Sequence, residues 1–210
     1  MTRRLAILLL AAATFLLSAG PAAAWSFFGG EDGDGELVET VYDLDDCDAI
    51  RLECGLDLVI TLGDEQRVVL VMDANLVDSF SLEARGGVLV IDAEDDPRPS
   101  KRARLEMTLA ALERVDIEGA GDVDVRDYRG EELTISVDGA GDLDLDGQVD
   151  RLVIEIDGAG DVDARDLHAR EATVEVSGAG DVALHASESA DVTINGVGDV
   201  DVHGDPVRLE

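Results

Sequence analysis

The sequence predicts an all-β protein, a right-handed β-helix or closely related β-solenoid with turns of about 20 residues. The first observation is a repeated phrase: Gly-Ala-Gly-Asp begins at residues 119, 139, 158 and 178, and Gly-Val-Gly-Asp begins at 196. The steps between copies are 20, 19, 20 and 18 residues. The second observation is that each copy lies between short segments of alternating apolar and polar residues, a pattern typical of half-buried strands. The third is that no segment beyond the N-terminal leader shows a helical period.

The first 24 residues have the pattern of a secretory signal peptide. A basic start at Arg3 and Arg4 is followed by 13 apolar residues, 5–17, and by Ala22-Ala23-Ala24 as a cleavage site before Trp25. The apolar run is too short for a membrane-spanning helix, and no later stretch is apolar enough to cross a bilayer. We therefore expect an exported protein without an integral membrane segment after cleavage, in the periplasm, at the cell surface or outside the cell.

After the leader, residues 25–39 are expected to form a flexible acidic linker, since their glycines and acids bury too little apolar surface to become ordered. One domain is expected over 40–210, with N-terminal strands at 40–105 and repeat turns at 106–210. Residues 68–72 are continuously apolar, as in a strand buried on both faces. Gly86-Gly87 separates two strand-like segments over 79–91 and predicts a hairpin or a tight corner.

Each repeat turn is expected to point one apolar stripe inward and acids outward, because side chains alternate faces along a strand. A single turn buries too few side chains to offset the entropy of ordering about 20 residues, so several turns must stack. The two glycines of each phrase are expected to permit a sharp corner with positive φ. The expected inward residues are Val115, Ile117, Val123, Val125, Ile135, Val137, Leu143, Leu145, Ile154, Ile156, Val162, Ala164, Val174, Val176, Val182, Leu184, Val192, Ile194, Val200 and Val202, with Tyr128, Val149 and Leu167 in the connectors.

The charge of the chain restricts its partners. Without Arg3 and Arg4, 14 of the 16 basic residues remain against 48 acidic residues, which gives the exported chain a net charge of −34. Such a charge argues against nucleic acid and anionic membrane surfaces as partners, whereas it is compatible with cations, cationic partners or a salty habitat.

Cys47 and Cys54 are the only cysteines of the chain. Export makes a disulfide between them permissible. Cys54 also shares its position parity with apolar residues such as Leu52 and Leu56, which favours a buried thiol instead. Both interpretations stay open at the level of sequence.

Stacking would place the last residue of each phrase in a column with a spacing of about 4.8 Å. Neighbouring unit charges at that distance repel by about 1 kcal/mol in water and by more where they are shielded. Two explanations are open: each carboxylate accepts hydrogen bonds from backbone N–H groups of its own corner, or calcium bridges neighbouring carboxylates. The candidate calcium ligands are Asp122, Asp142, Asp161, Asp181 and Asp199, and no other cofactor is expected.

A second column is expected four residues after each of these aspartates, with a cross-strand ladder of alternating charge in its first three members. Two imidazoles in adjacent turns, with Asp201 nearby, could hold zinc or copper, although such exposed pairs are usually plain surface. His168 lies in a connector and carries no further signal. The column consists of Arg126, Asp146, Arg165, His185 and His203.

The Gly-Ala-Gly-Asp copies resemble the head GIN domain of autotransporter adhesins, as do the segment from Gly55 to Ile91 and the approach from Leu112 to Ile117. The resemblance covers about Val41 to Leu209. It implies a right-handed β-helical fold in an exported bacterial protein, and it supplies no catalytic residues.

We therefore expect a non-catalytic, adhesin-like or scaffolding module that binds a protein or glycan at the cell envelope. The alternatives are a calcium-dependent binding protein or a polysaccharide-active β-helix enzyme. Paired carboxylates suited to glycoside cleavage, such as Asp142 with Asp144, occur in every turn, and no turn departs from the pattern as an active site would. Aromatic residues make up only 3% of the chain, and none lies in a glycine phrase.

Overall fold

The fold is described from a computed structural model that covers residues 3–4, 30–100 and 102–210. Apart from Arg3 and Arg4, which form a short strand β1, the expected leader at 1–24 lies outside the described residues. So do residues 25–29 of the expected linker. No helix in the described part of the chain is long and apolar enough to cross a membrane.

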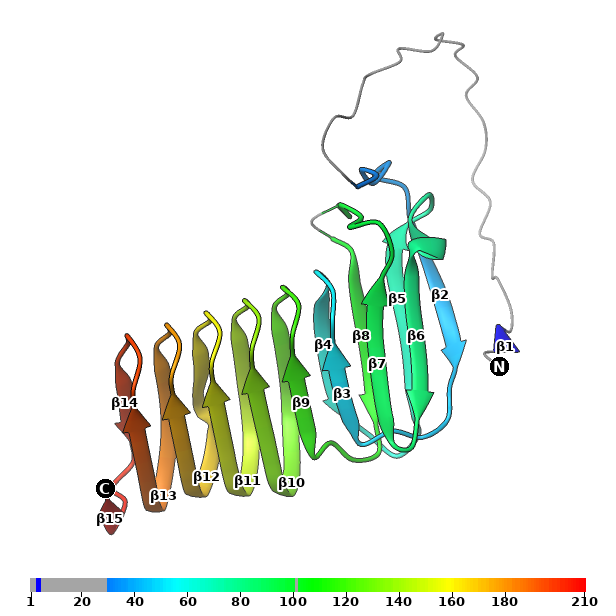
Figure 1. Ribbon diagram of the computed structural model, residues 1–210. Helices are drawn as coiled ribbons and strands as arrows, with labels where there is room; N and C mark the ends of the chain where they lie inside the picture. The colour runs from blue at the N-terminus through cyan, green and yellow to red at the C-terminus, as the bar shows by residue number, and fades with distance from the viewer. Residues whose placement is uncertain (1–2, 5–29, 101) are drawn as a thin grey trace, which may run out of the picture.

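Strands make up the described fold, together with one short 3-10 helix, η1 (Val77–Ser79). The expectation of an all-β solenoid is thereby confirmed (Figure 1). The strands are β1 (Arg3–Arg4), β2 (Leu37–Asp43), β3 (Ala49–Leu52), β4 (Asp57–Leu62), β5 (Arg67–Asp73), β6 (Phe80–Arg85), β7 (Val88–Ala93), β8 (Arg104–Leu109), β9 (Arg114–Ile117), β10 (Val123–Val137), β11 (Leu143–Ile156), β12 (Val162–Val176), β13 (Val182–Ile194), β14 (Val200–His203) and β15 (Arg208–Leu209).

The repeat turns stack in parallel and in the order of the sequence. Strands β10 to β13 each run down from a glycine corner, bend at the lower edge and return to the next corner, so the corners form the row of narrow loops at the top of Figure 1. Val123 pairs with Leu143, and the same register continues through Val162, Val182 and Val200. The steps of 18 to 20 residues are therefore single turns of the solenoid.

The N-terminal strands extend the same two walls. Strand β4 pairs in parallel with the downward half of β10, and β3 pairs in parallel with β9, which continues the wall of the returning halves. Beyond them β8 and β7 add one more parallel strand to each wall, and β5, β2 and β6 follow in antiparallel pairing. The expected hairpin is confirmed: β6 and β7 are joined by Gly86 and Gly87 alone, both with positive φ.

One continuous apolar core lies between the two walls. The first four sets of inward residues, the three connector residues and the apolar run at 68–72 are buried as expected. The fifth set differs: Ile194 is 44% exposed, and Val192, Val200 and Val202 are only partly buried. No further described turn covers the solenoid there, since β15 pairs only with Ser189 and Ala190 of β13.

The corner glycines serve a different purpose from the one expected. Gly198 is the one corner glycine with positive φ, so the corners do not generally require that conformation. Instead, a Cβ added to Gly160 would lie 2.1 Å from the carbonyl oxygen of Gly141 in the preceding turn, and one added to Gly178 would lie 2.0 Å from that of Gly158. Glycine is needed because successive backbones approach too closely to admit a side chain.

The segment expected to be a flexible linker is held by hydrogen bonds from Gly30 onward, and β2 already begins at Leu37. The buried carboxylate of Asp73 accepts hydrogen bonds of 2.7 Å from the amides of Gly35 and Ser100. Burial acts to raise the pKa of Asp73, but these hydrogen bonds outweigh it and leave the pKa below its ordinary value. Asp73 therefore ties the segment before β2 to the loop before β8.

Both cysteines are free thiols and buried, so the disulfide left open above is not present in this structure. Burial, reinforced by nearby carboxylates, raises the pKa of Cys47 to about 11 and that of Cys54 to about 12. The amide and the thiol of Cys47 both donate to Oε1 of Gln66.

Candidate functional site

The aspartates of the glycine phrases form a ladder along the upper edge of the solenoid. Oδ1 of each accepts a hydrogen bond from the backbone amide of the equivalent aspartate in the next turn, at 2.8 Å for Asp161 with Asp181 and 3.3 Å for Asp122 with Asp142. The donor is thus the neighbouring turn, and not the carboxylate's own corner as one explanation assumed. Asp57 begins the ladder, since its Oδ1 accepts from the amide of Asp122 at 3.2 Å. Sequence reasoning missed Asp57 because no glycine phrase precedes it.

The ladder holds successive turns together through side chains as well as backbone. All five of its repeat-turn aspartates are exposed, so most of their charge is screened by water. Within residues 30–100 and 102–210, no group of three or more His, Cys, Asp or Glu side chains is arranged to hold a metal ion. Calcium bridging between pairs of these carboxylates stays a prediction, for which a test is given in the Discussion.

The second expected column is not assembled. Asp146 pairs in register with Asp166 instead of Arg165, and it accepts a hydrogen bond from the amide of Asp127. Arg126 binds Asp124 of its own strand with an Nε–Oδ2 distance of 2.8 Å.

Arg165 likewise binds Asp163, two residues earlier in its own strand. The expected ladder of alternating charge between turns is therefore replaced by pairs within single strands. His185, His203 and Asp201 are all described residues and do not form the three-ligand zinc or copper site that was considered.

A different column occupies the lower edge, where the long strands bend. Arg129 pairs with Gln148, Gln148 with His168, His168 with His185, and His185 with His203. The rings of His168 and His185 are 4.5 Å apart between centroids and nearly perpendicular. We call these five residues the donor column, since each carries nitrogen donors and none is a carboxylate.

The donor column escaped the sequence analysis because the turns differ in length at the lower edge. Between the aligned pairs Ala164–Leu184 and His168–His185, β12 contains three more residues than β13. Counting a fixed offset from the aspartate therefore placed His185 beside Arg165, whereas the shorter turn brings it beside His168. An alignment of the small apolar residues Val149, Ala169 and Ala186, which are buried one position later, could have revealed the shift.

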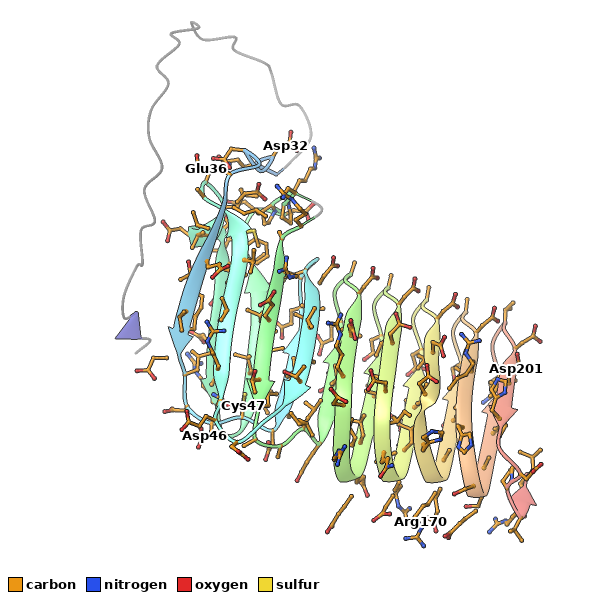
Figure 2. All side chains as sticks on the ribbon, turned by 180° about the vertical axis from the view of Figure 1, so that it is seen from behind. Asp32, Glu36, Asp46, Cys47, Arg170 and Asp201 are labelled. Carbon is orange, nitrogen blue, oxygen red and sulfur yellow. The ribbon has the colours of Figure 1, made fainter. Side chains whose placement is uncertain are left out.

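An open groove of about 430 Å³ runs along this edge. Four members of the donor column line it, and Gly130, Val149 and Ala169 contribute small residues from the next position in three consecutive turns. Figure 2 shows Arg170 at the lower edge of the solenoid. Its guanidinium is bound to Asp150, with an Nη1–Oδ1 distance of 3.4 Å, and to Glu188 at 2.8 Å.

The first turn supports the groove from inside. Tyr128 is buried beneath Gly130, where an added Cβ would lie 2.3 Å from the tyrosine hydroxyl oxygen. That hydroxyl lies 2.8 Å from the carbonyl oxygens of both Leu112 and Glu132, and it donates to one of them. Burial raises the pKa of Tyr128 to about 12, and the carboxylates of Glu113 and Glu132 add to the effect. The hydroxyl therefore stays protonated and fixes the bend beside Arg129.

The donor column differs from its surroundings in having unpaired donors. Among the arginines of residues 106–210, Arg129 is the one with no carboxylate within 4.0 Å among the described residues. Gln148 and His168 make no side-chain hydrogen bond to a described residue, and Nδ1 of His185 is shielded from solvent without a described partner. An acceptor-rich ligand in the groove would find several donors already in place.

Comparison with known families places this fold. Residues 46–206 match the family described as "Putative auto-transporter adhesin, head GIN domain". The chain belongs to this family. The match covers more than half of the chain and includes every glycine phrase, so the resemblance seen in the sequence is confirmed.

Solved structures with the same fold come from gut bacteria. A "putative adhesin" from Bacteroides fragilis superposes with a TM-score of 0.71 and 19% identity, covering 86% of this chain and 94% of that one. A second, from Parabacteroides merdae, has a TM-score of 0.56 and 16% identity, covering 87% and 95%. At these identities the likeness establishes the fold of the GIN domain alone. No curated protein matches the chain.

Proposed function

We propose that this GIN-domain protein is a non-catalytic, adhesin-like module of the cell envelope whose contact surface is the donor column. The observation that carries the proposal is the groove at the lower edge, where unpaired donors from four consecutive turns line one continuous surface. Membership of a family named for adhesins supports a binding role in an exported protein.

The regularity of the solenoid supports binding over catalysis. A binding surface can distribute contacts over equivalent turns, whereas an active site needs one turn with its own constellation of groups. The donor column offers hydrogen-bond donors at the repeat spacing of the turns, about 4.8 Å. Its residues come from bends that backbone pairing on both sides holds in place, so little ordering is required on binding.

Binding of the labelled protein to immobilised polysaccharides, glycoproteins and lipid vesicles tests this proposal. We expect retention on at least one surface, and loss of that retention in a variant that combines Arg129→Gln with His168→Ala. The matched control is Arg126→Gln, which removes an exposed arginine of the same turn outside the groove.

The proposal fails if the double variant and the control bind as the parent protein does. It also fails in its non-catalytic part if a bound polysaccharide is cleaved, which release of reducing ends would reveal.

A further inference from the structure

We propose that the ligand of the donor column is a linear polysaccharide bearing carboxylate groups, laid along the axis of the solenoid. This inference rests on the proposed function and specifies its ligand class. It follows from four properties of the groove: its direction, its donors, the pairing of its strands and the neutralisation of its rim.

The direction of the groove favours a linear polymer. Arg129, Gln148, His168 and His185 belong to four consecutive turns and are paired in register, so their positions span about 14 Å along the axis. His203 extends the column by one more turn, to about 19 Å. A polymer running along the axis can contact all five positions, whereas a small molecule can contact only two or three.

The donors favour a ligand with negative acceptors. The column contains a guanidinium, an amide and imidazoles, and it lacks a carboxylate in a chain of 48 acidic and 16 basic residues. The guanidinium of Arg129 is unpaired among the described residues, and its planar fork matches a carboxylate in bidentate geometry. Gln148 can donate to hydroxyl or ring oxygens of the intervening sugars.

The strand pairing disfavours an acidic peptide. Peptides add to a sheet through a free strand edge, but β11 and β12 are paired on both sides through the lower edge. The small residues Gly130, Val149 and Ala169 also provide no apolar pockets for peptide side chains. A sugar polymer requires neither feature.

The groove is locally protected from the large negative charge of the protein. Asp150 is the one carboxylate among the lining residues, and Arg170 binds both it and Glu188. At a salt concentration of about 0.15 M the Debye length is about 8 Å, so more distant acids are largely screened. A carboxylate beside Arg129 therefore meets mainly the donors of the column.

Titration calorimetry of the purified protein with polygalacturonate, a linear polymer of uronic acid, tests the proposal. The measurement is made in calcium-free buffer with about 0.15 M sodium chloride, and neutral dextran is the comparison polymer. We expect binding of polygalacturonate and not of dextran. Arg129→Gln should weaken binding by about tenfold or more, the effect of losing one charge-assisted pair. Arg126→Gln, which changes the net charge equally, should leave the affinity within about twofold of the parent protein.

The outcomes separate this inference from the proposed function. If dextran binds as tightly as polygalacturonate and Gln148→Ala weakens both, the groove is a glycan site and the carboxylate specificity is wrong. Equal losses in the two arginine variants would also overturn the specificity, since only overall charge would then matter. If neither polymer binds, and no immobilised surface shows binding that depends on the column, both the inference and the proposed function are wrong.

Discussion

Substitution of Gly160 by alanine tests the close stacking of the corners. The added Cβ would lie 2.1 Å from the carbonyl oxygen of Gly141, a backbone atom that cannot rotate away. An ordinary contact between these atoms needs at least 3.0 Å. The two turns must therefore separate locally by about 1 Å, or the corner must distort.

The expected cost follows from the hydrogen bonds that cross this corner. The amide of Ala159 donates to the Gly139 carbonyl at 2.9 Å, and the amide of Gly160 donates to the Ala179 carbonyl at 3.2 Å. Separation by about 1 Å takes such bonds beyond useful length, and each contributes about 0.5–1.5 kcal/mol. Together with the strain of overpacking, we expect the free energy of unfolding to fall by about 2–4 kcal/mol. For a domain of this size the Tm should fall by roughly 5–15 °C.

Urea and thermal unfolding of the purified protein, followed by circular dichroism, measure this effect. Ala159→Ser is the matched control, because Ala159 occupies the same corner with its side chain exposed, and its free energy of unfolding should change by less than about 0.5 kcal/mol. A Gly160→Ala protein as stable as the control would refute the conclusion that backbone contact between turns is what requires glycine.

Three further predictions concern the carboxylates and the thiols. If calcium bridges the ladder aspartates, calcium chloride should raise the Tm saturably and beyond sodium chloride at matched ionic strength; an equal effect of the two salts would leave the ladder as hydrogen bonds alone. Asp73→Asn should lower the free energy of unfolding by about 2–4 kcal/mol at neutral pH, because it weakens two amide hydrogen bonds to a buried charge. Since the folded pKa of Asp73 is depressed, its contribution is present above the unfolded pKa of about 3.9 and disappears as the pH falls through the folded pKa, so the gap between parent and variant should close in acid and a gap that persisted there would contradict this assignment. With pKa values of about 11 and 12, Cys47 and Cys54 should react with a thiol reagent at pH 8 only after unfolding in urea, whereas immediate labelling, or the absence of free thiols after unfolding, would contradict buried free cysteines.

The sequence by itself determined the architecture of this protein. Alternation with a period of two residues identified the buried faces of the strands, and the recurring glycine phrase identified the length of a turn. Both signals are local, because side-chain direction along a strand and the position of a corner depend on a few neighbouring residues. The hairpin at Gly86-Gly87 could be predicted for the same reason.

The contacts between turns were decided only by the tertiary structure. Whether a corner glycine serves its own φ or the approach of another backbone cannot be read from the phrase, and the partner of each ladder aspartate lies 18 to 20 residues away. The open fifth turn shows the same limit, since Ile194 has the pattern of a core residue but no described neighbouring turn covers it.

The candidate site depended most on the tertiary structure. Small differences in turn length at the lower edge shift the register between strands, so His168 and His185 meet although they occupy different offsets in their repeats. Arg129 joins them from two turns away, and nothing near it in the sequence marks it as different from Arg126. Period and corners follow from the order of the residues, but a surface built across turns follows from how the turns align, which backbone pairing and core packing decide together.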